Sequence, residues 1–234
     1  MKGAARLYLW DIDGTILLSG GASTRALDRV FLDRYGVAGA MATINCAGKT
    51  DPIIIGEIFA ANLGRAPRDA EVDDVLADYV PLLRSELSRS PGFVLMPYVC
   101  EALDHLAARG DALLGIATGN VRAAAQAKLE RADLWQRFAV GGYGCDHFDR
   151  GRLVRRAIER GSELAGREFR GDEVVVIGDT PLDVAAARAC GARAVLVATG
   201  YAADREVLRR AQADVLLEDL SGLAAWIEEQ GVHG

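Results

Sequence analysis

The sequence predicts an α/β fold, with a doubly wound, mainly parallel Rossmann-like sheet and a helical cap domain inserted after the first strand. From residue 96 onwards, short apolar runs alternate strictly with helical stretches. That alternation is typical of a mainly parallel sheet with helices on both faces. Residues 17–92 instead show helical spacing and no convincing strand. We therefore predict a core domain made of residues 1–16 and 93–234, and a cap domain made of residues 17–92.

The composition is that of a globular protein, and it gives no sign of a nucleic-acid or membrane partner. Of the 234 residues, 50% are hydrophobic and 26% are charged, and the net charge of −6 includes no long run of one sign. The N-terminal apolar run is short and is interrupted by aspartates, so we interpret it as neither a signal peptide nor a membrane span. We expect a cytoplasmic protein that is a monomer or a homodimer.

The four cysteines are far apart in the chain and show no CxxC spacing. This distribution favours buried free thiols in a reducing compartment over metal ligation or disulfides. The positions are Cys46, Cys100, Cys145 and Cys190.

The first predicted strand ends in two aspartates. The apolar residues 7–10 lead into Asp11-Ile12-Asp13-Gly14-Thr15. Because side chains alternate along a strand, Asp11 and Asp13 would point the same way if the strand continued. Two like charges about 4 Å apart repel by roughly 4 kcal/mol at an effective dielectric of about 20, so we expect a cation or a proton between them. Gly14 allows a sharp turn and Thr15 can bond a backbone group or an anion, although aspartate and glycine are also common in ordinary turns.

Three helices are predicted in the cap region. The first has apolar residues at helical spacing and a possible cap at Thr24. The second begins after Asp51-Pro52, where proline suits a first helical turn. The third is closed by Ser90-Pro91-Gly92. The predicted ranges are 23–35, 53–63 and 72–87.

The rest of the chain is predicted to alternate between helices and strands. Glycines close two of the helices, and the strand at 173–177 has the strongest strand character in the sequence. The predicted helices are 98–109, 120–130, 152–164, 181–190, 203–211 and 220–229, and the predicted strands are 112–117, 138–140, 173–177, 194–198 and 215–217.

Polar residues directly follow three of the apolar strand runs. Asp11 and Asp13 follow the first strand, Thr118-Gly119-Asn120 follows the strand 112–117, and Gly178-Asp179-Thr180 follows the strand ending at 177. Ligands of parallel α/β folds bind beyond the carboxyl ends of the strands. We therefore expect these residues to meet at one edge of the sheet.

Carboxylates at this edge favour a magnesium site. Asp11, Asp13 and Asp179 would supply hard oxygen ligands and leave room for water, as Mg²⁺ prefers. Asp183 lies one helical turn beyond Asp179 and could support the site. The alternative is that Asp179 and Asp183 simply cap a helix N-terminus and match its dipole.

Thr118-Gly119-Asn120 offers a hydroxyl, an open backbone amide and a carboxamide at a predicted helix N-terminus. Such a combination can bind an anion. The alternative is that Asn120 acts only as the helix cap.

Three other patterns do not make functional motifs. Gly48-Lys49-Thr50 resembles the end of a P-loop, but Thr43 stands where the first glycine should be. Gly141-Gly142-Tyr143-Gly144 lacks the third glycine of a dinucleotide fingerprint, because His147 occupies that place. No motif supports a serine–histidine–aspartate triad.

The motifs at the strand ends resemble those of the haloacid dehalogenase-like hydrolase superfamily. Asp11-Ile12-Asp13-Gly14-Thr15 looks like its first motif, Thr118 like its second, and Gly178-Asp179-Thr180-Pro181-Leu182-Asp183 like its fourth. The helical insertion resembles the cap of the phosphoglycolate phosphatase-like members. The resemblance spans nearly the whole chain.

The resemblance implies a phosphatase that acts on a small phosphorylated metabolite. Asp11 would be the nucleophile that forms an aspartyl-phosphate, and Asp13 the general acid and then the base. The cofactor would be Mg²⁺, held by the Asp11 carboxylate, the Asp13 backbone carbonyl and Asp179, with Thr15 and Asp183 in support. Thr118, Gly119 and Asn120 would bind phosphate oxygens.

The third motif departs from the family pattern. Relatives usually supply a lysine there, and the matching stretch, residues 146–156, has none. Arginine keeps the charge and can bind phosphate through two N–H groups. We predict that Arg150 takes this role, with Arg152 as the second choice and with Arg155 and Arg156 on a solvated helix face.

Substrate identity would be set by the cap. Lys49, Thr50 and Arg25 could face the cleft, although exposed basic residues are usually just solvated.

Other functions are compatible with parts of the pattern. A phosphomutase of the same superfamily is the nearest alternative. A dehalogenase would need neither the metal nor the second aspartate, and a receiver-like signalling domain would not need a lid of this size. A non-catalytic phosphate-binding protein is also possible, because a fold does not fix a function.

Overall fold

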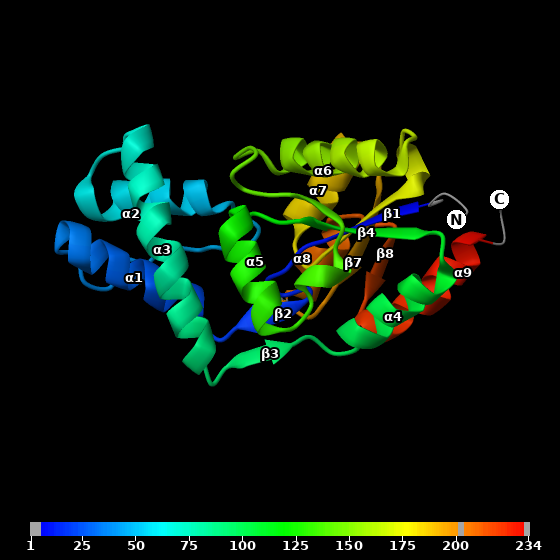
Figure 1. Cartoon of the computed structure of the whole chain (residues 1–234), viewed down its shortest axis with the longest axis horizontal. Helices are drawn as coiled ribbons and strands as arrows, with labels where there is room; N and C mark the ends of the chain where they lie inside the picture. Colours follow the sequence, from blue (N-terminus) through cyan, green and yellow to red (C-terminus); the bar gives the residue numbers. More distant parts are fainter. Residues whose placement is uncertain (1–5, 201–203, 232–234) are drawn as a thin grey trace.

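The protein has two lobes that lie side by side, as Figure 1 shows for the computed structural model, which describes residues 6–200 and 204–231. The larger lobe contains a sheet with helices on both faces. The smaller lobe contains α1 (Ala22–Tyr35), α2 (Asp51–Leu63) and α3 (Asp69–Arg89).

Within the described residues, the larger lobe is built on a six-stranded sheet in which neighbouring strands run parallel. β1 lies in the interior of the sheet and pairs with β4 on one side and β6 on the other. This confirms the predicted doubly wound, mainly parallel sheet. Across the sheet the strands are β5 (Val140–Gly142), β4 (Ala112–Ala117), β1 (Arg6–Trp10), β6 (Val174–Gly178), β7 (Arg193–Val197) and β8 (Val215–Leu217).

Both faces of β1 are buried, because its side chains alternate between two hydrophobic clusters. Leu7 and Leu9 pack with residues of α6, α7 and α8, whereas Tyr8 and Trp10 pack in the cluster that includes α4, α5 and α9. Figure 1 shows α6 and α4 on opposite sides of the sheet. The helices are α4 (Val99–Arg109), α5 (Arg122–Arg131), α6 (Arg150–Ala165), α7 (Pro181–Ala189), α8 (Arg205–Arg210) and α9 (Leu223–Gly231).

The smaller lobe has a hydrophobic cluster of its own, to which α5 of the larger lobe also contributes. Phe31 of α1 and Phe59 of α2 meet edge to face, with ring centroids 5.3 Å apart. Tyr79 of α3 is fully buried in the same cluster. The separate cluster supports the predicted division into cap and core, whose boundaries stay a prediction.

The prediction of no strand in residues 17–92 was wrong. β2 (Leu17–Ser19) pairs antiparallel with β3 (Phe93–Leu95) where the chain passes between the lobes. Three residues are too few to show an alternating pattern, and the strand depends on a partner that is distant in sequence. A second correction concerns the predicted strand 138–140, which lies instead at Val140–Gly142, where two glycines weaken the local strand signal.

The ends of some helices differ from the predicted ones. The helix predicted at 152–164 begins at Arg150, because Asp149 caps it by accepting a hydrogen bond from the Arg152 amide at 2.9 Å. The stretch predicted as a helix at 220–229 starts with a 3₁₀ turn, Leu220–Gly222. Of the helix predicted at 203–211, the structure has α8, and residue 203 lies outside the described residues.

The four cysteines are free thiols, but the prediction that they are buried was wrong. Cys100 and Cys145 are exposed, and Cys46 and Cys190 are partly exposed. Among the helices that the structure describes, none is long and apolar enough to cross a bilayer.

We predict that Gly142→Ala destabilises the fold by about 1–3 kcal/mol through overpacking. A Cβ atom at Gly142 would overlap the backbone carbonyl of Leu153 in α6, which packs against β5 at this point. Gly56→Ala is the matched control, because a Cβ there meets nothing within 4 Å and alanine favours a helix interior by about 0.5–1 kcal/mol. Urea unfolding of both variants tests this, and equal or increased stability in Gly142→Ala would contradict the packing argument.

Candidate active site

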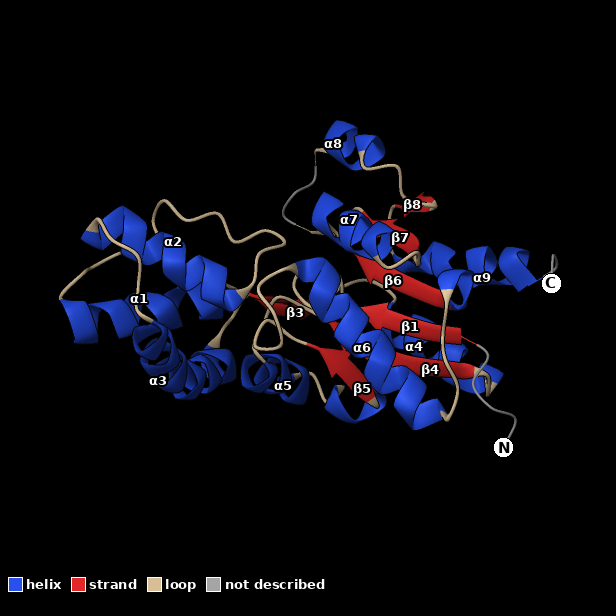
Figure 2. Cartoon of the chain, turned by 90° about the horizontal axis from the view of Figure 1, so that it is seen from above, coloured by secondary structure: helices blue, strands red, loops and turns tan. Residues whose placement is uncertain are grey.

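The polar residues at the strand ends gather at one edge of the sheet. Asp11 follows β1, Thr118 follows β4 and Asp179 follows β6. These strands are adjacent, and the edge where they end lies toward α1–α3, as Figure 2 shows. A cavity of about 350 Å³ between the lobes is lined by residues from both.

A tight turn after β1 brings its aspartates to the cavity. The Asp11 amide still donates to the Ile177 carbonyl at 2.9 Å, and the turn is closed by the Gly14 amide, which donates to the Leu17 carbonyl at 2.9 Å. Gly14 has φ of 87°, and a Cβ there would overlap the Asp179 carboxylate. Only glycine fits this turn without strain.

Three carboxylates are buried together beside the turn. Oxygens of Asp11, Asp179 and Asp183 lie within 4.8 Å of one another. Burial and the neighbouring carboxylates raise the pKa of Asp11 to about 6 and that of Asp179 to about 9. The Thr15 hydroxyl lies 3.5 Å from Asp179 Oδ1. A divalent cation with oxygen ligands fits this cluster, because it would replace protons that the ion-free carboxylates retain.

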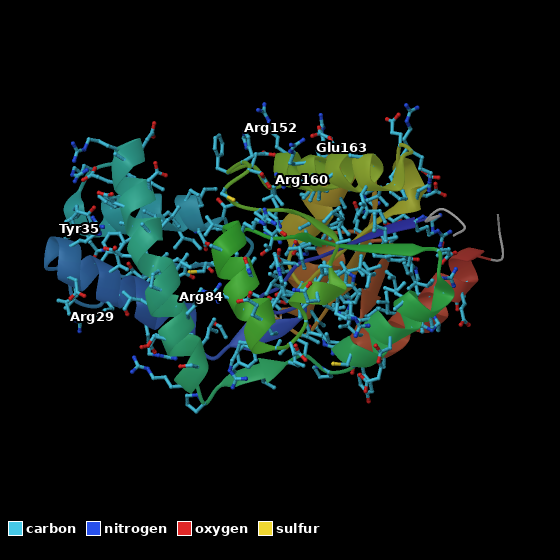
Figure 3. The ribbon with its side chains drawn as sticks, in the orientation of Figure 1. Arg29, Tyr35, Arg84, Arg152, Arg160 and Glu163 are labelled. Carbon is cyan, nitrogen blue, oxygen red and sulfur yellow. The ribbon has the colours of Figure 1, made fainter. Side chains whose placement is uncertain are left out.

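Arg150 is the cation that reaches this cluster. Its Nη2 atom lies 3.0 Å from Asp11 Oδ1, and its Nε atom donates to Asp183 Oδ1 at 2.9 Å. Arg152 is exposed and contacts His147, and Figure 3 shows it at the outer surface of α6. Arg155 and Arg156 bond Ala189 and Glu159 away from the cluster.

Asp183 also holds the start of α7. Its Oδ2 atom accepts from the Thr180 amide at 3.0 Å and from the Thr180 hydroxyl at 2.7 Å, in a capping box. Its other oxygen accepts from Arg150. The capping and the site-supporting interpretations of Asp183 are therefore compatible, because each uses a different carboxylate oxygen.

Thr118 and Asn120, which follow β4, are linked to Asp13 by hydrogen bonds. The Asn120 carboxamide donates to Asp13 Oδ2 at 2.7 Å and to the Thr118 hydroxyl at 2.8 Å. The alternative in which Asn120 caps the helix does not match the structure, since α5 begins at Arg122 with Val121 as its N-cap.

Lys128 is the residue that the sequence analysis missed. It is 2% exposed, and its ammonium donates to both Asp13 oxygens at 2.8 and 2.7 Å and to Asn120 Oδ1 at 2.6 Å. All three of its N–H groups are thereby used. A signal was present, because Lys128 is a single lysine in an alanine-rich helix about two turns after Asn120, but the third-motif cation was predicted within residues 146–156.

The start of α2 and the loop before it contact the core around the end of β4. The Asp51 amide donates to the Gly119 carbonyl at 2.8 Å, and the Asp51 carboxylate accepts from the Val121 amide at 2.7 Å. Arg150 Nη1 donates to the Gly48 carbonyl of the same loop at 3.3 Å. Burial raises the pKa of Asp51 to about 6, and the nearby Lys128 ammonium opposes that rise.

The three cap residues singled out in the sequence lie in different environments. Lys49 lines the cavity, but its ammonium is held by both Glu57 oxygens at 2.7 Å. Thr50 is buried beside the cavity and its hydroxyl has no hydrogen-bond partner. Arg25 bonds Glu86 at 2.7 Å and lies outside the cavity lining.

Comparison with known protein families identifies the family of this chain. A family model described as haloacid dehalogenase-like hydrolase matches residues 8–188. The chain belongs to the haloacid dehalogenase-like hydrolase family. This confirms the resemblance identified from the sequence motifs.

Two curated relatives of this chain are named phosphoglycolate phosphatase. The protein from Rhodospirillum rubrum is 28% identical over 232 residues, which cover 95% of this chain and 90% of the relative. The protein from Synechococcus elongatus is 37% identical over 134 residues, which cover 57% of this chain and 59% of the relative.

Solved structures share the hydrolase fold at low sequence identity. A hydrolase from Pseudomonas syringae is 21% identical with a TM-score of 0.70, and the match covers 97% of this chain and 99% of that one. CbbY from Rhodobacter sphaeroides, in complex with phosphate, is 18% identical with a TM-score of 0.68, and the match covers 94% and 96% of the two chains.

We predict that Asp51→Asn makes the protein more stable at pH 8 and leaves its stability at pH 4 almost unchanged. Because the folded pKa of Asp51 is raised from 3.8 to about 6, its contribution to stability is lost as the pH rises through that window. A shift of that size corresponds to about 3 kcal/mol. Asparagine keeps an oxygen that can accept from Val121 and does not ionise.

Urea unfolding of the wild type and Asp51→Asn at pH 4 and pH 8 measures this difference. The control is Asp33→Asn, which replaces a solvent-exposed carboxylate on α1. An Asp51→Asn variant that loses stability equally at both pH values would show that the charge of the Asp51 carboxylate does not destabilise the folded protein.

Proposed function

We propose that this hydrolase is a Mg²⁺-dependent phosphatase that cleaves a small phosphate monoester through an aspartyl-phosphate intermediate. The observation that carries the proposal is the buried cluster of Asp11, Asp179 and Asp183, which opens on a cavity beside Asp13 and Thr118. The names of the two curated relatives, both phosphoglycolate phosphatases, support a small phosphate ester as the substrate.

Asp11 is the nucleophile in this proposal and Asp13 is the proton carrier. A carboxylate oxygen of Asp11 bonds to phosphorus while the ester P–O bond breaks, and Asp13 gives its proton to the leaving alcohol oxygen. Asp13 then takes a proton from water, which attacks the phosphorus. This frees Asp11 and releases inorganic phosphate.

The remaining residues position the charges of the phosphoryl group. The Asp11 carboxylate, the Asp13 backbone carbonyl and Asp179 would hold Mg²⁺, which supplies positive charge to the phosphate oxygens when it is bound. Arg150, Thr118 and the Gly119 amide would bind phosphate oxygens. Arg150 is suited to this because it is already oriented beside Asp11, with Nη2 3.0 Å from the carboxylate.

We predict that the wild type releases phosphate from an aryl phosphate in the presence of Mg²⁺, and that Asp11→Asn abolishes this turnover. The amide of asparagine is a poor nucleophile and removes one ligand charge. Phosphate release is measured with and without a chelator, and Asp33→Asn serves as the exposed-carboxylate control. Activity that persists in the chelator would exclude the metal mechanism, and sugar-phosphate interconversion without net phosphate release would favour a phosphomutase.

We predict that Lys128→Met lowers kcat about 100-fold on an alkyl phosphate. The reason is that loss of a correctly positioned general acid or base typically lowers the rate by a factor of about 10² or more. KM should change little, since the hydrogen bonds of the Lys128 ammonium are already made to Asp13 and Asn120. Arg122→Gln is the control, because it removes an exposed cation from the same helix. A kcat within twofold of the wild type would show that Asp13 does not depend on Lys128.

A further inference from the structure

The cap side of the cavity includes a patch of apolar side chains. Side chains from all three cap helices and from the loop between α1 and α2 form its wall. The wall includes Leu27, Met41, Ile44, Ile54 and Tyr79. Such a surface favours a substrate whose leaving group has a hydrocarbon body.

Two hydroxyl groups in this wall have no hydrogen-bond partner apart from a weak contact with each other. Tyr79 is 0% exposed and lines the cavity, and its buried hydroxyl has only the Ser23 side chain within reach of a weak hydrogen bond. The Ser23 hydroxyl is buried as well and has no other partner. A buried hydroxyl that bonds nothing is unfavourable, so a ligand that bonds it gains specificity.

The cations that line the cavity already form ion pairs with carboxylates of the protein. Among the described residues, these cations are Lys49, Lys128 and Arg150, and each is paired with a carboxylate. Asp51 adds a further acidic group on the cap side. A second anionic group on the substrate would therefore enter a confined site without a free cation to pair with it.

We propose that the leaving group is an uncharged alcohol with an apolar body and a hydrogen-bonding group that reaches Tyr79 and Ser23. This inference rests on the proposed phosphatase function and specifies its substrate class. The proposed substrate differs from phosphoglycolate, for which the two curated relatives are named. The leaving group of phosphoglycolate carries a carboxylate, whereas the proposed leaving group is uncharged.

The first test compares phosphate esters of matched size with different terminal charge. The substrates are 2-phosphoglycolate, 2-hydroxyethyl phosphate and 2-aminoethyl phosphate, each assayed with Mg²⁺ for kcat/KM. We expect the hydroxyl ester to exceed both charged esters at least tenfold. A preference for either charged ester overturns the inference.

An aryl phosphate assayed in the same experiment distinguishes a failure of the phosphatase function from a failure of the substrate class. No hydrolysis of any ester overturns the proposed function and this inference with it. Hydrolysis of the aryl ester together with preferred hydrolysis of 2-phosphoglycolate overturns only the substrate class.

The second test uses Tyr79→Phe, which removes the unpartnered hydroxyl and keeps the ring that fills the cap cluster. A series of ω-hydroxyalkyl phosphates is compared with n-alkyl phosphates of the same length. In the wild type, we expect the hydroxyl to raise kcat/KM at least tenfold at one chain length. Tyr79→Phe should lose that advantage and keep the wild-type rate on the n-alkyl esters.

Tyr35→Phe is the matched control, because Tyr35 belongs to the same cap cluster but lies outside the cavity lining, as Figure 3 shows for its place in the cap. A hydroxyl advantage that survives in Tyr79→Phe, or that is absent from the wild type at every length, overturns the inference. Equal thermal unfolding of the two variants excludes a difference in folding as the cause.

Discussion

The structure depends on the burial of like charges at one edge of the sheet. Asp11, Asp179 and Asp183 come from three places in the chain, and their oxygens lie within 4.8 Å of one another. Burial and the neighbouring carboxylates raise the pKa of Asp179 to about 9 even though Arg150 lies beside the cluster, so full ionisation of the three carboxylates favours the binding of a further cation. The turn at Gly14, the capping box at Thr180 and the Arg150 side chain all lie against this cluster.

Asp11 and Asp13, although separated only by Ile12, are held by different cations. Arg150 lies against Asp11, whereas Lys128 binds both oxygens of Asp13. The Lys128 ammonium is buried and also bonds Asn120, so it holds the Asp13 carboxylate in place at the cavity. This arrangement gives a physical reason why adjacent carboxylates can carry separate roles in the proposed reaction.

The cap is joined to the core at this site by hydrogen bonds that each include a backbone group. Asp51 bonds Gly119 and Val121, and Arg150 bonds the Gly48 carbonyl. The strand end that is proposed to bind phosphate is therefore also a docking point for the cap. A change at Gly119 would affect both, because a Cβ there would overlap the Lys49 carbonyl.

The parallel α/β sheet, the helical insertion and the polar residues at the strand ends could all be predicted from the sequence. These follow from local patterns: apolar runs that alternate with helices, and polar residues that directly follow those runs. Three contacts could be seen in the folded chain alone: Lys128 bonds Asp13, the Lys49 ammonium pairs with Glu57, and β2 pairs with β3. The physical reason is that each of these depends on where a side chain or a short strand meets its partner, and such partners carry no signal in the local periodicity of the chain.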